Sequence, residues 1–179
     1  MTSNGSVYKV LFLCTGNSAR SILAEAILNR VGDGRFIGYS AGSQPTGKVN
    51  ETARELLTDL GYDTSKLRSK SWQEFGSEDR ASSPETEFDL VVTVCDSAAK
   101  ESCPVWVGHP LTVHWGLPDP AAVTGDDVTK RAAFDDCYAM LSDRIKRLVR
   151  LPLESMTRPE LTQVLQGLGQ TLPQNQEML

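Results

Sequence analysis

The 179-residue sequence has little of three features on which many protein classes depend. It carries 18 Lys and Arg against 23 Asp and Glu, so it lacks the positive excess that nucleic acids or phospholipid surfaces attract. Its two histidines, His109 and His114, do not have metal-ligand spacing, so no metal site is expected. No apolar run approaches the ~20 residues of a membrane span, and residues 1–6 do not resemble a signal peptide. We therefore expect a soluble, cytoplasmic monomer without nucleic-acid or membrane partners.

Cysteine is also scarce, and each of the four cysteines can be considered singly: Cys14, Cys95, Cys103 and Cys137. In a reducing cytoplasm these side chains rest as thiols, so a disulfide would be a catalytic event. Cys137 lies on the apolar side of a predicted helix and is expected to be a small core residue.

Apolar runs and helical periodicities alternate along the chain. Expected strands cover residues 7–14, 35–40, 88–95 and 111–115, and expected helices cover residues 21–31, 50–60 and 127–150. Parallel strands joined by right-handed helical crossovers form an open sheet. We predict an α/β fold, with an open four-stranded parallel sheet and helices on both faces, in one domain at residues 7–152. Residues 153–179 are predicted to be a C-terminal tail, partly helical or disordered.

The strongest functional signal is the stretch Val10–Ser21, in which an apolar strand ends in Cys14 and Arg20 follows six residues later. Turn-forming residues between them, such as Gly16 and Asn17, can wrap backbone N–H groups around one tetrahedral oxyanion. Arg20 adds a planar fork of donors, and its positive field is expected to hold Cys14 as the nucleophilic thiolate. The predicted oxyanion-binding residues are Thr15, Gly16, Asn17, Ser18, Ala19, Arg20 and Ser21.

This spacing has a simpler interpretation, a buried strand-end cysteine beside a surface arginine. The apolar run before Cys14 and the helix that starts directly after Arg20 favour the first interpretation, an anion-binding loop at residues 14–21, which we call the cradle. Ser21 is a candidate hydrogen-bond donor to the Cys14 sulfur, although a simple helix cap explains it as well.

Reactive residues also follow the other predicted strands. Asp119, held between two prolines, is the candidate general acid, with turn formation as its alternative role. Cys95 and Cys103 flank a small polar loop, which suggests a thiol relay, whereas a lone strand-end cysteine is usually a core residue. Asp96 is expected to raise the pKa of Cys95. Because the carboxyl ends of parallel strands meet at one edge, Cys14, Cys95 and Asp119 should converge.

Several of these motifs together resemble one known family, the arsenate reductases of the low-molecular-weight tyrosine phosphatase fold. The matching stretches are Cys-Thr-Gly-Asn-Ser-Ala-Arg-Ser at 14–21, Ser-Ala-Gly at 40–42, Val-Cys-Asp at 94–96, Cys-Pro at 103–104 and His-Trp-Gly-Leu-Pro-Asp-Pro-Ala at 114–121. The resemblance covers about residues 7–152 and leaves out a polar excursion at 76–85. It implies a flavodoxin-like topology and a mechanism with three cysteines.

In the mechanism that the resemblance implies, Cys14 attacks arsenate held by the loop amides and Arg20, while Asp119 protonates the departing oxygen. Cys95 then attacks the Cys14 sulfur, arsenite leaves and a Cys14–Cys95 disulfide remains. Cys103 attacks Cys95, and a thioredoxin-like or glutaredoxin-like partner, the latter with glutathione, reduces the resulting Cys95–Cys103 disulfide. No organic cofactor is implied.

The chain departs from these relatives in ways that bear on its loop and its reductant. Ala19 stands where many relatives carry a further cysteine, and the Cys95–Cys103 spacing is one residue longer than in thioredoxin-coupled enzymes. Some relatives bind potassium beside the loop, and the residues that support the loop here are Asn17, Glu25, Ser40 and Lys70. Because the Lys70 ammonium takes the place of an aspartate in that site, we predict no potassium requirement.

Two other functions remain as alternatives. A low-molecular-weight protein tyrosine phosphatase would use the same cradle to hydrolyse phosphoesters through a phosphocysteine at Cys14. Family phosphatases place an aromatic residue after the Asp-Pro pair, where this chain has Ala121 and Ala122, so only weak phosphatase side activity is expected. A non-enzymatic oxyanion or redox sensor is disfavoured, because the chemical groups for turnover are all present.

Overall fold

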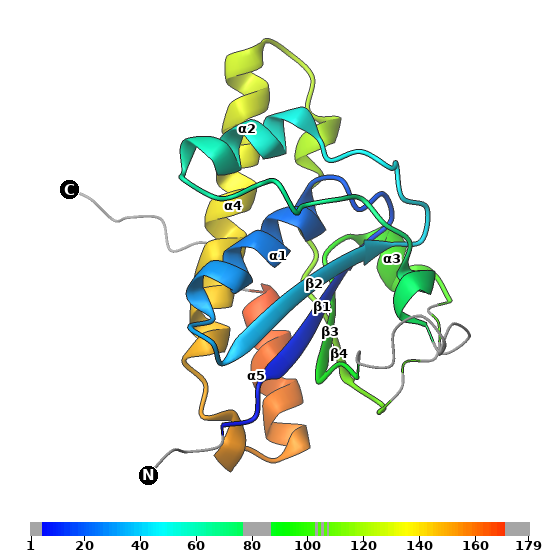
Figure 1. The fold of residues 1–179 in the computed structure, drawn as a ribbon, viewed down its shortest axis with the longest axis vertical. Helices are drawn as coiled ribbons and strands as arrows, with labels where there is room; N and C mark the ends of the chain where they lie inside the picture. The colour runs from blue at the N-terminus through cyan, green and yellow to red at the C-terminus, as the bar shows by residue number, and fades with distance from the viewer. Residues whose placement is uncertain (1–4, 77–86, 103, 105, 107, 171–179) are drawn as a thin grey trace, which may run out of the picture.

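The computed structural model describes residues 5–76, 87–102, 104, 106 and 108–170 and shows an α/β fold (Figure 1). Its four strands are parallel in the order β2-β1-β3-β4, so the predicted open sheet is confirmed. The strands are β1 (Tyr8–Cys14), β2 (Phe36–Gly42), β3 (Leu90–Thr93) and β4 (Leu111–His114). The α-helices are α1 (Arg20–Val31), α2 (Glu51–Asp59), α3 (Asp96–Lys100), α4 (Asp127–Val149) and α5 (Arg158–Gln170), and the short 3₁₀ helices are η1 (Trp72–Phe75), η3 (Pro120–Ala122) and η4 (Leu153–Ser155).

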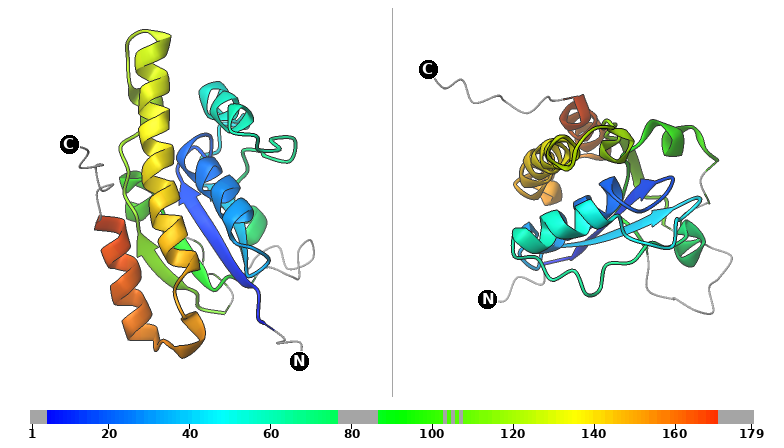
Figure 2. Two further views of the ribbon diagram at one scale, coloured as in Figure 1. Left: turned by 90° about the vertical axis from the view of Figure 1, so that its left-hand side faces the viewer. Right: turned by 90° about the horizontal axis from the view of Figure 1, so that it is seen from above.

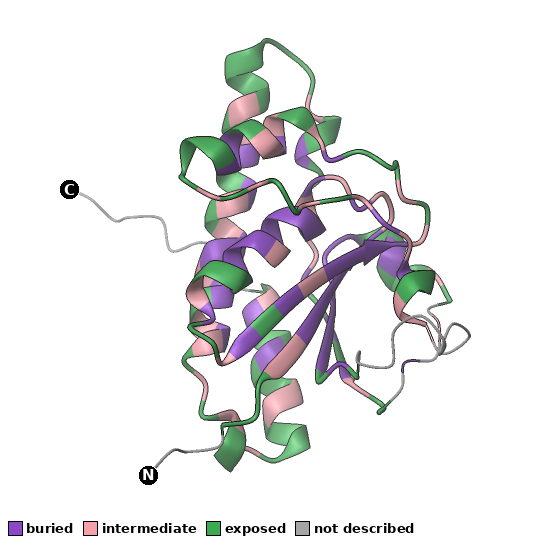
Figure 3. Ribbon diagram, viewed as in Figure 1, coloured by how far each residue is buried: buried purple, intermediate pink, exposed green. Residues whose placement is uncertain are grey.

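Both faces of the sheet are covered, but by unequal layers. Alternate residues of β1 point to opposite sides: Phe12 joins the large core formed with α1, α2, α4 and α5, while Leu11 and Leu13 join a smaller cluster with Trp72 of η1. The strands are accordingly buried along most of their length (Figure 3). This continuous burial is why β1 reads as an unbroken apolar run in the sequence.

The third predicted strand ends at Thr93 and not at Cys95, and a short helix follows where a polar loop was expected. β3 stops at Thr93, and Cys95 instead caps α3, its sulfur accepting the N–H of Ala98 at 3.3 Å. The polar loop predicted after Cys95 therefore begins as a short helix. The difference arises because small residues such as Ala98 and Ala99 can form one helical turn once a side chain satisfies the first N–H groups.

Helix α5 lies beside α4 and β4 (Figure 2). It buries Leu165 and Leu168, and the Leu165 carbonyl accepts a hydrogen bond from the Trp115 indole at 2.8 Å. A helix was expected here, while the assignment of residues 153–179 as a separate tail stays a prediction. None of the described helices is long and apolar enough to cross a membrane. The excursion predicted at 76–85 lies, beyond Gly76, outside the described residues.

Two glycines of α5 provide a test of how closely this helix packs against His114 and Trp115. A Cβ at Gly169 would lie 2.5 Å from the His114 carbonyl and 2.7 Å from the Trp115 ring, whereas a Cβ at Gly167 would meet nothing within 4 Å. We expect Gly169→Ala to lower the free energy of unfolding by about 1–3 kcal/mol through overpacking. Gly167→Ala should raise it by about 0.5–1 kcal/mol, since alanine favours helix. Chemical denaturation of both variants tests this, and equal effects would contradict the close docking.

Candidate active site

The proposed site lies where the carboxyl ends of the strands face α3 (Figure 1). Cys14 is the last residue of β1, and its side chain is hydrogen bonded to that of Cys95, which follows β3. Arg20, at the start of α1, approaches Asp119 with 3.6 Å between Nη2 and Oδ2. The structure therefore brings together Cys14, Arg20, Cys95 and Asp119. Cys103 lies outside the described residues, so its place in the relay stays a prediction.

The loop between Cys14 and Arg20 turns its carbonyl groups outward. The carbonyls of Thr15, Gly16 and Ser18 accept backbone N–H groups from Gln44, Thr46 and Asn50, respectively, at 2.9, 3.0 and 2.9 Å. The first N–H groups of α1 have no side-chain cap, because Ala19 occupies the N-cap position. Backbone N–H groups are thus left for an anion, in the manner of helix N-termini that bind phosphate. Ser21 lies inside the helix, so the structure does not support its role as the cap.

Asn17 holds the sharp bend of this loop. It adopts a φ of 43°, its amide donates to the Ser21 hydroxyl at 2.8 Å, and its carbonyl oxygen accepts the Lys70 N–H at 2.9 Å. Gly16 and Asn17 were both expected to allow unusual backbone angles; the positive φ falls on Asn17, which confirms its predicted left-handed turn, and not on Gly16. The reason is that Asn17 is fixed by two buried hydrogen bonds, which offset the cost of a left-handed conformation.

Arg20 is largely buried, with 13% of its side chain exposed, and it donates to the Leu117 carbonyl at 3.0 Å. This contact ties the cradle to the loop that carries Asp119. The Asp119 side chain is 44% exposed, and its Oδ1 accepts the Ala121 N–H at 3.0 Å. Asp119 therefore forms the turn at η3 and still faces the guanidinium, so its two predicted roles are compatible.

The ionisation of Cys14 and that of Cys95 depend on each other. Their mutual hydrogen bond and burial raise the pKa of Cys14, against the opposing effect of Arg20. The Cys14 thiol lowers the pKa of Cys95, helped by the backbone N–H groups of Ala98 and Thr15. The Thr15 N–H lies 3.4 Å from the Cys95 sulfur. That Arg20 holds Cys14 as the thiolate stays a prediction: the guanidinium lowers the pKa of Cys14, while the contact with Cys95 and burial raise it.

Asp96 does not act on Cys95 as expected. The pKa of Cys95 is lowered and not raised, and the exposed Asp96 carboxylate pairs with His114 Nε2 at 2.9 Å. The other ring nitrogen of His114 lies 2.8 Å from the Thr93 hydroxyl. Cys137 is a buried thiol whose pKa burial raises to about 12, which confirms it as a core residue.

Lys70 lies beside the loop, where its ammonium is predicted to replace a metal cation. Its ammonium donates to the Arg68 carbonyl at 3.1 Å and to the Ser40 hydroxyl at 3.5 Å, and lies 3.8 Å from Glu25 Oε2. Ser40 in turn donates to Glu25. Burial lowers the pKa of Lys70 and raises the pKa of Glu25. That the ammonium takes the place of a potassium ion stays a prediction, which its contacts with these three oxygen atoms support. Within the described residues, no three His, Cys, Asp or Glu side chains form a metal-binding group.

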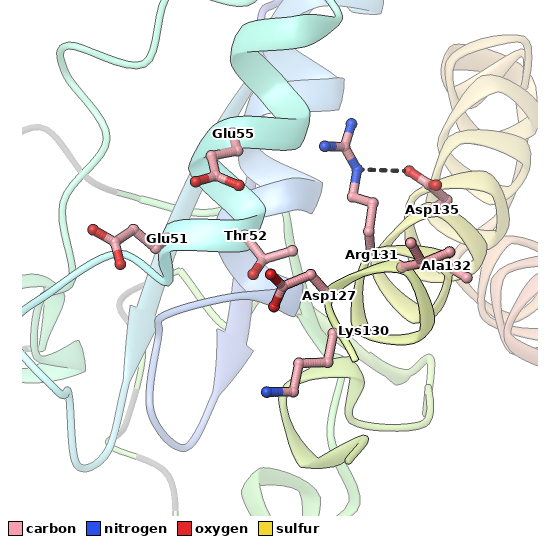
Figure 4. A pocket seen from close by; sticks show the side chains of 9 residues that line it. Glu51, Thr52, Glu55, Asp127, Lys130, Arg131, Ala132 and Asp135 are labelled. Carbon is pink, nitrogen blue, oxygen red and sulfur yellow. Dashed lines mark hydrogen bonds and ion pairs between the residues drawn. The ribbon is translucent and has the colours of Figure 1, made fainter. Parts of the chain in front are cut away.

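An open pocket of about 650 Å³ lies between α2 and α4 (Figure 4). Carboxylates predominate in its lining, and Arg131 there is paired with Asp135 at 3.2 Å and with Asp59 at 3.0 Å. No predicted site residue lies among the described residues that line it. Because its charge repels oxyanions, this pocket is not the substrate site.

Sequence reasoning missed the roles of two residues in this site, Glu101 and His114. The Glu101 carboxylate accepts a hydrogen bond from the Thr15 hydroxyl at 3.3 Å, although the two residues are 86 positions apart. His114 pairs with Asp96 across a gap of 18 positions. No local pattern indicates either pair, since both depend on how α3 and β4 pack.

Comparison with known proteins agrees with this geometry. Residues 9–161 match the family described as low molecular weight phosphotyrosine protein phosphatase. Arsenate reductases from Halalkalibacterium halodurans and Bacillus subtilis are 35% and 34% identical to this chain, each match covering 76% of this chain and 91% of the relative.

Among solved structures, an arsenate reductase from Archaeoglobus fulgidus is 31% identical with a TM-score of 0.56, covering 78% of this chain and 98% of that one. A low molecular weight protein tyrosine phosphatase from T. tengcongensis, at 23% identity and a TM-score of 0.60, shares the fold and is covered to 97% by a match over 79% of this chain. The resemblance seen in the motifs is thereby confirmed. The chain belongs to the low molecular weight phosphotyrosine protein phosphatase family, and its similar curated relatives are arsenate reductases.

Proposed function

We propose that this protein is an arsenate reductase that converts arsenate to arsenite through a relay of Cys14, Cys95 and Cys103. The observation that carries the proposal is that the Cys95 sulfur accepts the backbone N–H of Thr15, the residue directly after Cys14, at 3.4 Å, so the second thiol lies at the mouth of the cradle. A phosphatase has no use for a second thiol at this place. The naming of the curated relatives as arsenate reductases supports the same choice.

The first step forms a bond between the Cys14 sulfur and arsenic(V). The backbone N–H groups and Arg20 neutralise the oxyanion, and the Cys14 proton leaves with one arsenate hydroxyl as water, Asp119 passing this proton to the departing oxygen. In the free protein Arg20 contacts the Leu117 carbonyl and Asp119, so both partners are poised around the same guanidinium. This step changes no oxidation state.

The second step transfers two electrons. The Cys95 thiolate attacks the Cys14 sulfur, an S–S bond forms, and the S–As bond breaks with its electron pair staying on arsenic, which leaves as arsenite. The donors from Ala98 and Thr15 keep Cys95 anionic for this attack. Cys103 then attacks Cys95, which frees Cys14 and leaves a Cys95–Cys103 disulfide. A cytoplasmic dithiol reductant of the thioredoxin or glutaredoxin type supplies the two electrons that reset the cycle, and the protein works as a monomer.

Cys95→Ser is expected to abolish multiple-turnover arsenite formation, by about 1,000-fold or more, as does Cys14→Ser. Cys137→Ala, a buried thiol outside the relay, should keep most of the activity. The measurement is arsenite production with thioredoxin in parallel with glutaredoxin and glutathione, together with hydrolysis of p-nitrophenyl phosphate. Cys95→Ser should retain the weak phosphatase activity that Cys14→Ser loses.

Full arsenite turnover by Cys95→Ser would remove the relay. Rapid phosphoester hydrolysis by the unmodified protein, with no arsenite formed by either reductant, would favour the phosphatase alternative.

A further inference from the structure

The Thr15 hydroxyl lies between two acceptors. Its oxygen is 3.3 Å from Glu101 Oε1, to which it donates, and 3.6 Å from the Cys95 sulfur. A hydroxyl has one hydrogen, so it can donate to only one of these groups at a time. The carboxylate is the better acceptor. In the free protein the Thr15 hydrogen is therefore used by Glu101, and Cys95 does without it.

Glu101 reaches the cradle from the far end of α3. Cys95 caps this five-residue helix and Glu101 follows its last residue, so both ends of the segment contact Thr15. Thr15 directly follows Cys14 and is the first residue of the anion-binding loop. A half-buried carboxylate thus stands beside a site that concentrates positive potential for an oxyanion. Arsenate bound there repels Glu101, because like charges at this distance are only partly screened.

We propose that Glu101 is a substrate-displaced positioning residue, which keeps the Thr15 hydroxyl away from Cys95 until an oxyanion enters the cradle and sends Glu101 outward. The freed hydroxyl then donates to the Cys95 sulfur. This inference rests on the proposed function for its purpose: the second thiol receives its extra donor only when the first thiol has a substrate.

The timing matters because Cys95 loses a donor during the reaction. The Cys14 thiol is the main cause of the low pKa of Cys95 in the free protein. That thiol hydrogen is gone once the Cys14 sulfur is bonded to arsenic. The Thr15 hydroxyl replaces it at the step in which Cys95 must attack.

The experiment is a double-mutant cycle of Thr15 and Glu101, in which the alkylation rate of Cys95 is measured. The full chain is reacted with iodoacetamide over a range of pH, and peptide mass spectrometry follows Cys95 separately from the other three cysteines. Thr15→Val removes the hydroxyl and keeps the backbone N–H. Without added anion, we expect Thr15→Val to change the alkylation rate of Cys95 by less than about twofold when Glu101 is present. In a Glu101→Ala background it should slow the reaction about threefold to tenfold, since a donor to the thiolate is then lost.

Inorganic phosphate occupies the cradle but is not reduced. At saturating phosphate, Thr15→Val should slow the alkylation of Cys95 about threefold to tenfold even when Glu101 is present. Glu101→Ala should also bind phosphate about threefold to tenfold more tightly, with the difference shrinking at high salt. Glu101→Gln keeps an acceptor without the charge, so it should gain phosphate affinity while retaining part of the hold on Thr15. Lys100→Ala, an exposed neighbour on α3, is the control and should behave as the unmodified chain.

An equal effect of Thr15→Val in all backgrounds, with and without phosphate, would overturn the proposal, as would unchanged phosphate affinity in Glu101→Ala. The assay contains neither arsenate nor a reductase. If Thr15→Val has the same effect on Cys95 alkylation in every background, and the protein makes arsenite, only this inference is refuted. If the effect depends on Glu101 and phosphate as expected, but the protein makes no arsenite, only the proposed function is refuted.

Discussion

Gly42→Ala is expected to lower kcat/KM for arsenate by about 100-fold, although Gly42 belongs to β2 and not to the anion-binding loop. A Cβ at this position would lie 2.5 Å from the Thr15 carbonyl oxygen and 2.8 Å from that of Cys14. Both atoms belong to the backbone of the cradle, so neither can move aside as a flexible side chain would. The loop must shift by a sizeable fraction of an ångström, and a misplaced nucleophile is costly to the rate. Steady-state arsenite formation measures the effect.

A second readout separates a displaced loop from a collapsed fold. Gly42→Ala should lose affinity for inorganic phosphate in a binding titration while its free energy of unfolding falls by only about 1–3 kcal/mol. Gly76→Ala is the matched control, because a Cβ there would meet its nearest atom at 3.6 Å. Wild-type kcat/KM in Gly42→Ala would show that the loop tolerates the shift and that the close approach has no role.

Lys70→Met is expected to lower the free energy of unfolding by about 3 kcal/mol at neutral pH. The ammonium is 7% exposed and is the cation beside Glu25, whose side chain is 15% exposed. Removing it leaves a buried carboxylate without its partner. The same change loosens the cradle, since Lys70 holds Glu25 and Ser40 while its backbone N–H fixes Asn17. Denaturant unfolding and arsenite assays measure both losses.

The loss in Lys70→Met should depend on pH in a defined direction. Burial already raises the pKa of Glu25, and Lys70 opposes that rise. Without Lys70 the folded-state pKa of Glu25 rises further above its unfolded value. A raised pKa gives stability that is fully present below the unfolded pKa, about 4.3, and is lost as pH rises through the folded pKa. The difference in the free energy of unfolding between the unmodified protein and Lys70→Met should therefore widen as the pH rises above the unfolded pKa of about 4.3, and level off above the folded pKa.

Two comparisons test whether these losses arise from removing the Lys70 charge beside Glu25. Adding Glu25→Gln to Lys70→Met removes both charges and should remove the pH dependence of this difference. Potassium chloride should restore activity to Lys70→Met more than choline chloride of equal ionic strength, because the cation can then take the place of the ammonium. Lys48→Met changes an exposed lysine and should show neither effect. If Lys70→Met and added potassium both leave the activity unchanged, the prediction that the Lys70 ammonium replaces a potassium ion is refuted.

The amino-acid sequence by itself determined the sheet and the cradle. Both are local: an apolar run buried on two faces predicts β1, and the short interval from Cys14 to Arg20 contains the turn and the helix start on which the proposed anion site depends. The parallel order of strands then follows from short crossovers, which is why Cys14, Cys95 and Asp119 could be expected at one edge. Glu25, Ser40 and Lys70 were found only through the resemblance to known relatives.

Tertiary structure alone decided how these residues act on one another. Three interactions join residues far apart in the chain: the coupled ionisation of Cys14 and Cys95, the pairing of Asp96 with His114, and the hydrogen bond from Thr15 to Glu101. Each depends on where α3 packs, and the sequence showed that segment as a polar loop. Hydrogen bonds and pKa shifts depend on ångström distances and on the count of nearby donors, and no spacing along the chain encodes these when several elements meet.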